Sequence, residues 1–592
     1  MKLRTLLLAL CALLAAGCDE ADPVHTAAPA QTNAFPECTY EDHASIVNAT
    51  INYRIPMRDC VHLSTNVTFP AHKAERYPVI LIRTPYGKGN DRYGGFSGIT
   101  ALFHPYGFVT IIQDTRGRFE SEGVHVVLKD EPSDTEDTLA WLERQPWFDG
   151  RVGVWGLSYL AMSSIAAGIA RPDLVDALVV GIMGSDFYTL GAEHGVARAD
   201  GLRFASGTVT SDSLDGIFDD AKISEEIQKF PLAEADVRAG LGSVPFKELF
   251  MQHLDKDDFW LGIIDPAKWR ASDLPIYMLT GWYDFQWRSQ VLDWNALYAR
   301  RGTQDLYLHI GPWPHLLGFL PVHDYPFSDP RTGLEALADS VNFMRRYVLG
   351  EDVFNDEHRV TYYDGGTGQW HRTDRLWPAQ TQQLVFYPAN ALTPGDCPGR
   401  LADSPASAET TGYTYDPYEV FELPGVMTLF EGAMKKEALW CGRSDAVVFE
   451  TPAFTEDVEI AGDILADLDV STDVEDTPFV ARLSLVETDG EIYNLREGVM
   501  LLSHREGDEQ KVAYSPGDRA TLTVPITPLR WTLHAGEKLR LGIASTAWPM
   551  IVPHPNVAGD WVNATEGIVA HQTIHMGIGS DTKLRLTVRT QP

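Results

Sequence analysis

A serine stands where an apolar run of the sequence gives way to a helical stretch, a place that suits a nucleophile. Residues 151–155 predict a buried strand, and Ser158 lies between this strand and a predicted helix over 162–170. An abrupt strand-to-helix turn exposes the serine hydroxyl and points the first helix amides at an incoming oxyanion. Leu160 takes the place of the second glycine of the usual Gly-x-Ser-x-Gly pattern, so the motif alone also fits an ordinary helix cap.

Two more reactive side chains follow later apolar runs. Asp284 comes after the run 275–280, and His315 comes after the run 306–310. The ligand crevice of an open α/β sheet lies beyond the carboxyl ends of its strands, so we expect the three side chains to meet there. The chain order Ser158, Asp284, His315 is that of the triad in an α/β-hydrolase fold.

Proton transfer gives each of these residues a role. Because serine is a poor nucleophile at neutral pH, His315 would take its proton as Ser158 attacks a carbonyl carbon. Asp284 would hold the imidazole in one tautomer and stabilise the imidazolium. The backbone amide of Tyr159 and the phenol of Tyr86, both just past strand ends, are expected to donate to the oxyanion. Each residue alone also fits a structural role, but their joint order favours catalysis.

The elements that would position these residues alternate between about 50 and 350. Short β-branched runs separated by helical stretches predict a mostly parallel sheet covered by helices. Most of the runs lack period-two alternation, as strands buried on both faces do. Ser133 and Glu136 predict a capping box that opens the helix before the third strand. The expected strands are 78–83, 108–113, 151–155, 177–182, 275–280 and 306–310.

Two regions depart from this alternation. Residues 185–272 contain polar helical segments without a convincing strand, which predicts an inserted helical cap. Residues 356–592 contain alternating runs and an Asp489-Gly490 turn, which predict an antiparallel β-sandwich of jelly-roll type. The fold class is therefore α/β, with an α/β-hydrolase domain made of residues 37–184 and 273–355.

The first residues predict export. Two positive charges precede the apolar run 6–16, which is far shorter than the ~20 residues of a membrane-spanning helix, so residues 1–17 read as a signal peptide. They end before Cys18 in a sequence that resembles a bacterial lipoprotein signal, in which this cysteine receives the lipid. Residues 18–36 would then be a tether. The expected location is the bacterial periplasm or cell envelope, and ordinary cleavage to a soluble periplasmic protein is the alternative.

Six cysteines and a strong negative charge limit the remaining possibilities. Four cysteines remain after Cys11 and Cys18 are set aside, and in an oxidising compartment they predict disulfides. Proximity favours Cys38–Cys60 and Cys397–Cys441 among three connectivities. The 592 residues carry a net charge of −34, which excludes a nucleic-acid binder with a basic face and disfavours adsorption to anionic membranes. Membrane association is expected only through the lipid anchor, and the sequence does not fix the oligomeric state.

Several short motifs occur together before residue 160. They are Arg83-Thr84-Pro85-Tyr86, the stretch 113–118 with Ser121-Glu122-Gly123, Gln145-Pro146-Trp147 and Gly156-Leu157-Ser158-Tyr159. Together they resemble the CocE/NonD hydrolases, the bacterial cocaine-esterase-like members of the S15 X-prolyl dipeptidyl-peptidase group. The resemblance runs from about residue 45 to the end and implies the same cap and jelly roll. It also implies a nucleophile at Ser158, an acid at Asp284, a base at His315, and oxyanion donors at Tyr86 and the Tyr159 amide.

Two departures from the family bear on the site. The family motif usually continues Ser-Tyr-x-Gly, whereas Ala161 stands at the last place, and we expect one methyl to shift the turn only slightly. Related α-amino-acid ester hydrolases bind the substrate ammonium with carboxylates near the catalytic aspartate, where this chain has Phe285-Gln286-Trp287. An ammonium would find no counter-ion there. We therefore expect an uncharged acyl group, of which an aromatic one is one option, with Trp155, Phe285 and Trp287 as pocket walls.

The sequence thus predicts a serine hydrolase that cleaves small carboxylic esters through an acyl-enzyme on Ser158. No cofactor is expected, and the absence of CxxC and HExxH spacing gives no reason to expect a metal. An amidase or an X-Pro-type peptidase would use the same triad, so only turnover distinguishes them. A surface protein that binds a carbohydrate or a partner without catalysis is the other alternative.

Overall fold

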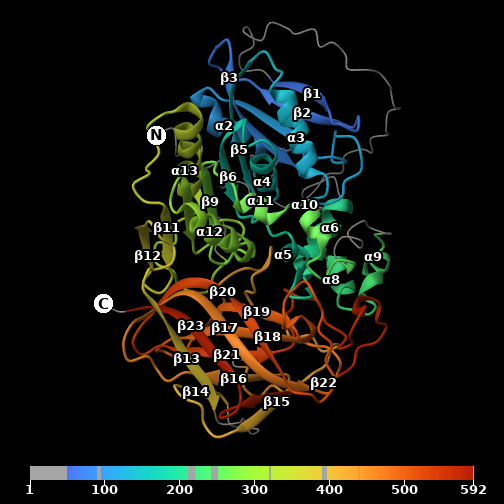
Figure 1. Cartoon of the computed structure of the whole chain (residues 1–592), viewed down its shortest axis with the longest axis vertical. Coiled ribbons are helices and arrows are strands. Elements are labelled where there is room, and N and C mark those ends of the chain that lie inside the picture. Colours follow the sequence, from blue (N-terminus) through green and yellow to red (C-terminus); the bar gives the residue numbers. More distant parts are fainter. Residues whose placement is uncertain are drawn as a thin grey trace.

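A ten-stranded sheet with helices on both faces lies above a second, β-rich domain in this computed structural model (Figure 1). The structure describes residues 50–89, 95–210, 221–241, 251–318, 322–389, 397–438 and 440–590. The predicted signal peptide, the tether, Cys18 and Cys38 lie outside these ranges. Within them, no helix combines the length and the apolar character needed to span a bilayer.

The first sheet confirms the predicted α/β-hydrolase core. Its strand order is β1-β2-β4-β3-β5-β6-β9-β10-β11-β12, and the strands from β4 to β11 run parallel to one another, whereas the strands at both edges are antiparallel. Every residue of β3, β4, β9 and β10 is buried, as expected for strands between two helical layers. The strands are β1 (Thr50–Pro56), β2 (His62–Thr68), β3 (Tyr77–Thr84), β4 (Val109–Asp114), β5 (Phe148–Leu157), β6 (Val175–Gly181), β9 (Ile276–Gly281) and β10 (Leu306–Gly311).

Helices that cover this sheet include α2 (Gly95–Phe103), α3 (Glu131–Leu142), α4 (Ala161–Ala170), α12 (Trp287–Arg301) and α13 (Leu334–Met344). The predicted capping box of α3 is wrong. Asp130 is the N-cap residue, and the Ser133 hydroxyl donates to the Asp130 carbonyl from inside the first turn. Pro132 lies in that turn, where its missing N–H costs no helical hydrogen bond, and this fixes the earlier start.

Two strands expected in the sandwich belong to the first sheet. β11 (Val360–Asp364) pairs in parallel with β10, and β12 (Gln369–Thr373) pairs antiparallel with β11. This corrects the predicted sandwich start at residue 356, because β13 is the first strand that belongs to the sheet of the second domain. Alternation reveals a strand but not the sheet that it joins, so sequence reasoning placed both strands with their β-rich successors.

The segment between β6 and β9 is mainly helical, as predicted for a cap. A short hairpin of β7 (Ala192–Glu193) and β8 (Val196–Ala197) was not expected, because two-residue strands leave no periodic signal. The helices are α5 (Tyr188–Gly191), α6 (Ala199–Thr210), α8 (Ala221–Glu226), α9 (Ala235–Arg238), α10 (Asp258–Ile263) and α11 (Pro266–Arg270). In Figure 1, α6, α8 and α9 lie beside the first sheet and above the second domain.

The second domain is the expected β-rich one, and its strands pair antiparallel except for β14 with β16. The predicted Asp489-Gly490 turn joins β18 to β19, with Gly490 at a φ of 88°. The strands are β13 (Thr381–Ala389), β14 (Gly399–Ala402), β15 (Glu409–Tyr415), β16 (Ala446–Glu450), β17 (Val458–Thr472), β18 (Pro478–Val486), β19 (Ile492–Leu501), β20 (Ala520–Leu533), β21 (Lys538–Ala544), β22 (Ala570–Met576) and β23 (Lys583–Arg589).

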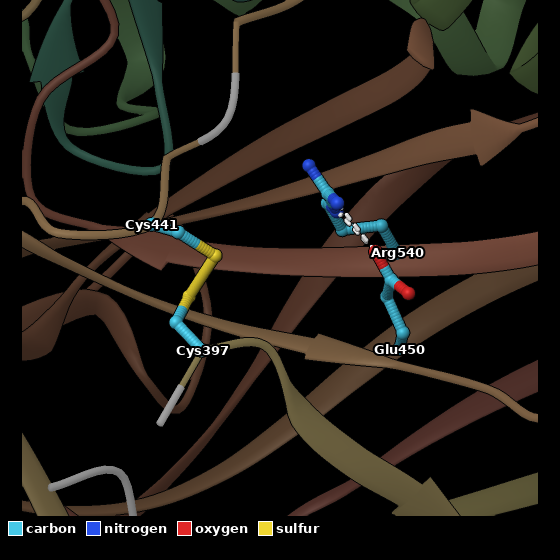
Figure 2. The surroundings of a disulfide bond; sticks show 4 residues. All are labelled: Cys397, Cys441, Glu450 and Arg540. Atoms are coloured by element: carbon cyan, nitrogen blue, oxygen red, sulfur yellow. Dashed lines mark hydrogen bonds and ion pairs between the residues drawn. A yellow bond between two sulfur atoms is a disulfide. The ribbon is translucent and has the colours of Figure 1, made fainter. Parts of the chain in front are cut away.

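One of the two predicted disulfides is present. Cys397 and Cys441 are bonded, next to the Glu450–Arg540 ion pair that bridges β16 and β21 (Figure 2). Cys60 is exposed and forms no disulfide with a residue that the structure describes, and its predicted partner Cys38 lies outside these residues, so this pairing stays a prediction.

Removal of the Cys397–Cys441 bond should destabilise the second domain. The bond closes a loop with a sequence separation of 44 residues, for which chain entropy gives about 4 kcal/mol as an upper estimate. We expect Cys397→Ser/Cys441→Ser to shift denaturant unfolding to lower denaturant concentration. Equal unfolding midpoints for the double variant and the native chain would contradict this role.

Candidate active site

Ser158 lies at a sharp turn between β5 and α4. Leu157 is extended, with φ −124° and ψ 143°, and Ser158 has a φ of 54°, in the left-handed region that non-glycine residues rarely adopt. A short 3-10 turn, η4 (Ser158–Leu160), then leads into α4. A Cβ at Gly156 would lie 2.2 Å from the Leu160 carbonyl oxygen, so the turn requires glycine before the serine. Leu160 has ordinary helical dihedral angles, with φ −62° and ψ −27°, so no glycine is needed there.

The loops that carry Asp284 and His315 are bonded to each other through the backbone. Gly281 at the end of β9 pairs in register with Gly311 at the end of β10. Beyond these residues, the Trp282 N–H donates to the Gly311 carbonyl at 2.8 Å, and the Tyr283 N–H donates to the Trp313 carbonyl at 3.0 Å. The positions of Asp284 and His315 are therefore fixed relative to one another by continued strand pairing.

The structure brings together the three residues predicted to form a triad. His315 Nε2 lies 2.7 Å from Ser158 Oγ, and His315 Nδ1 lies 3.2 and 3.1 Å from the two carboxylate oxygens of Asp284. Asp284 is fully buried and also accepts from the Gln286 N–H at 2.7 Å. With its proton on Nδ1, the imidazole donates to Asp284 and accepts from the Ser158 hydroxyl. This is the arrangement needed to remove the serine proton.

Tyr86 lies beside the serine, as expected for an oxyanion donor. Its phenol is hydrogen-bonded to Ser158, and burial raises the pKa of the phenol well above its ordinary value, so that it keeps its proton. The loop that follows β3 and carries Tyr86 is held in place because Arg118 Nε donates to the Pro85 carbonyl at 3.0 Å. The Thr115 N–H also donates to the Thr84 carbonyl at 2.9 Å.

The Tyr159 side chain packs against Tyr86. Its ring lies edge-on to the Tyr86 ring, with centroids 6.4 Å apart. Its hydroxyl accepts from the Leu128 N–H at 3.2 Å and donates to Glu131 Oε1 at 3.3 Å. Glu131 in turn forms a buried ion pair with Arg83. Sequence reasoning assigned only the backbone amide of Tyr159 and missed Glu131, since one carboxylate at the start of a helix usually interacts with solvent or the helix dipole.

Of the three predicted pocket walls, only Phe285 lies at the site. Its half-buried ring is 5.0 Å from the His315 ring. Trp155 is 2 % exposed and donates from Nε1 to Ser340 Oγ at 2.9 Å, whereas Trp287 is fully buried and donates to the Pro528 carbonyl at 2.9 Å. These contacts correct the prediction for Trp155 and Trp287, because both indoles fill the core and have no surface left for a substrate.

Arg198 from the cap was missed by sequence reasoning. Its guanidinium lies 5.9 Å from the centre of the Phe285 ring and pairs with Glu193 at 2.8 Å and with Asp200 at 3.0 Å. It also donates to the Met427 carbonyl at 2.8 Å. Arg198 therefore connects the cap to a loop of the second domain, next to the candidate active site. No local signal marks the contact with Met427, because the two residues are 229 positions apart in the sequence.

This arrangement can perform nucleophilic acyl transfer, and comparison with known proteins agrees with it. Residues 59–317 match the family model described as X-Pro dipeptidyl-peptidase (S15 family), and residues 352–585 match that of the X-Pro dipeptidyl-peptidase C-terminal non-catalytic domain. The two matched segments together span most of the chain. Among the described residues, no group of three or more His, Cys, Asp and Glu side chains could hold a metal ion.

Relatives of similar length share this organisation. The chain is 27 % identical over 553 residues to a cocaine esterase from Rhodococcus, covering 86 % of this chain and 92 % of the relative. A solved α-amino acid ester hydrolase has a TM-score of 0.76 at 19 % identity and covers 95 % of this chain and 100 % of its own. A CocE/NonD family hydrolase from Staphylococcus aureus has a TM-score of 0.66 at 17 % identity, covering 91 % and 93 %. The chain therefore belongs to the S15 family of serine hydrolases, as a CocE/NonD-like member.

Proposed function

We propose that this protein is a serine esterase that cleaves carboxylic esters through an acyl-enzyme on Ser158. The observation that carries the proposal is the contact of Ser158 Oγ with His315 Nε2 at 2.7 Å, while His315 Nδ1 contacts the buried Asp284. A serine esterase also agrees with the cocaine esterase of Rhodococcus, which is similar over most of both chains.

In the first half of the proposed reaction, Ser158 attacks the ester carbonyl and His315 takes the hydroxyl proton. The negative charge that develops on the carbonyl oxygen accepts hydrogen bonds from the Tyr86 phenol and the Tyr159 amide. Collapse of this intermediate breaks the bond to the alcohol, which leaves with the proton from His315. In the second half, His315 activates a water molecule, which attacks the acyl group and releases a carboxylic acid.

An uncharged acyl group fits the surroundings of His315 best. The Phe285 ring lies beside the imidazole, tilted by 50°, and offers an apolar surface. Arg198 lies near the Phe285 ring, and its guanidinium is paired with the carboxylates of Glu193 and Asp200. They are not free to receive a substrate ammonium, and a buried unpaired charge is costly. This favours neutral esters over X-Pro peptides with a free amine.

Export and lipid attachment at Cys18 remain proposals that rest on the sequence of residues 1–36 alone. The peptidase or amidase alternative keeps every catalytic residue and is separated from the esterase only by the substrate that is turned over.

A paired substrate panel tests the proposed activity. We expect the native chain to hydrolyse p-nitrophenyl acetate, butyrate or benzoate, and Ser158→Ala to lose this turnover while its melting temperature changes little, since only one oxygen is removed. Gly-Pro p-nitroanilide is the comparison substrate. Cleavage of the anilide at a rate similar to that of the esters would favour the peptidase, and unchanged ester turnover in Ser158→Ala would exclude Ser158 as the nucleophile.

Replacement of Asp284 tests the tautomer argument. Asp284→Asn keeps the shape of the side chain but no longer favours the proton on His315 Nδ1, so we expect kcat to fall by about 10⁴-fold. Steady-state kinetics on p-nitrophenyl butyrate measures this fall. A decrease of less than about tenfold would remove Asp284 from the triad.

Loss of the Tyr86 hydroxyl tests the oxyanion donor. We expect Tyr86→Phe to lower kcat roughly 10²–10³-fold with a much smaller change in KM, because the bond forms mainly in the transition state. Tyr413→Phe is the matched control, since this buried tyrosine in β15 bonds Ser545 in the second domain. Equal kcat values for the two variants would contradict the assignment.

A further inference from the structure

A cavity away from the candidate active site lies where the edge of the hydrolase sheet meets the β-rich domain. It has a volume of about 470 Å³ and is lined by β11, β12, the connection that follows β12, and residues of β20 and β23. Four arginines line it, namely Arg372, Arg375, Arg530 and Arg589, and none of its described lining residues is Asp or Glu. The chain as a whole has 82 acidic residues against 48 Lys and Arg, so this composition is opposite to that of the chain.

Part of the cavity wall is a rigid stack of side chains. Tyr362 of β11 and His371 of β12 are cross-strand partners whose rings are 5.0 Å apart and 15° from parallel. The guanidinium of Arg530 lies 4.1 Å from the centre of the Tyr362 ring. Arg530 is 5 % exposed and donates to the Leu376 carbonyl at 3.1 Å, so its position is fixed before any ligand arrives.

The charges of the cavity are incompletely balanced. Glu459 accepts from Arg530 Nε at 2.9 Å and from Arg589 Nη1 at 3.3 Å, so a single carboxylate serves two guanidinium groups. Within the described residues Arg375 has no carboxylate within ion-pair distance, and the neighbouring Asp374 lies instead 3.8 Å from His358. The buried Asp364 also acts on Tyr362, so three guanidinium groups against two carboxylates leave an excess of one positive charge. Arg372 is not counted, because it also interacts with Asp339.

The donors that a ligand in the cavity could reach are the guanidinium groups. His371 Nε2 has no hydrogen-bond partner in the part of the chain that the structure describes, but the atom is itself buried and is not counted among these donors. Guanidinium groups present paired N–H donors that match the oxygens of a phosphate group. A phosphate group has more oxygens and more negative charge than a carboxylate, so it can accept from several guanidinium groups at once.

We propose that this cavity is a binding site for a phosphate group, from inorganic phosphate or from the headgroup of an anionic phospholipid. The ligand would bridge Arg375, in the connection between the two domains, to Arg530 and Arg589 of the second domain. The site shares no lining residue with the triad, so the inference does not rest on the proposed esterase activity.

Calorimetric titration and vesicle flotation test this site, both with the Cys18→Ser chain so that no lipid anchor contributes. We expect the chain to bind inorganic phosphate more tightly than acetate, with binding that weakens as salt is added. Flotation with vesicles of phosphatidylglycerol, and not of phosphatidylcholine, would assign the headgroup as the source. Binding of phosphate without flotation would assign the free anion.

Two exposed arginines provide variants that should fold normally. We expect Arg375→Gln and Arg589→Gln each to weaken phosphate binding roughly tenfold, with ester hydrolysis unchanged. Arg346→Gln, at a half-buried arginine paired with Asp352 outside the cavity, is the control and should bind like the parent chain. The proposal is overturned if the parent binds neither phosphate nor phosphatidylglycerol vesicles, if acetate binds equally well, or if the cavity variants and the control bind alike.

Discussion

The in-register pairing of Gly281 with Gly311 is the constraint on which the candidate active site depends. The backbone bonds that continue this pairing hold the Asp284 and His315 loops together, so their side chains meet without a flexible connection. A Cβ at Gly281 would lie 1.9 Å from the Trp313 carbonyl oxygen, so only glycine allows this approach. The parallel sheet then brings the end of β5, with Ser158, to the same edge.

Two sets of paired buried charges lie near this edge, and each stands behind an aromatic ring of the candidate site. Arg83 and Glu131 lie behind the Tyr159 side chain, and Arg198 with Glu193 and Asp200 lies behind Phe285. Removal of one member would leave an uncompensated charge in a dry environment. These pairs hold the rings beside Ser158 and His315 in place while presenting a mainly apolar surface, which connects the packing to the preference for neutral esters.

The sequence was sufficient for the parallel core and for the order of the candidate catalytic residues. Fully buried strands leave continuous apolar runs, and the side chains just after them must share one edge. The sequence was insufficient where the partner of a side chain comes from another layer of the fold or from the other domain. Trp155 and Trp287 are aromatic residues near strand ends, but residue type does not distinguish a core position from a pocket wall. β11 and β12 alternate like sandwich strands, and Arg198 has partners that no local pattern reveals.

The most direct test of the account is the mass of the intact protein after reaction with a fluorophosphonate, followed by peptide mapping. The geometry predicts one covalent adduct located on Ser158 in the native chain, and strongly slowed labelling in His315→Ala, because the imidazole is needed to activate the hydroxyl. Absence of an adduct in folded protein, or labelling at another residue with Ser158 unmodified, would contradict the claim that these strand ends assemble a working nucleophile.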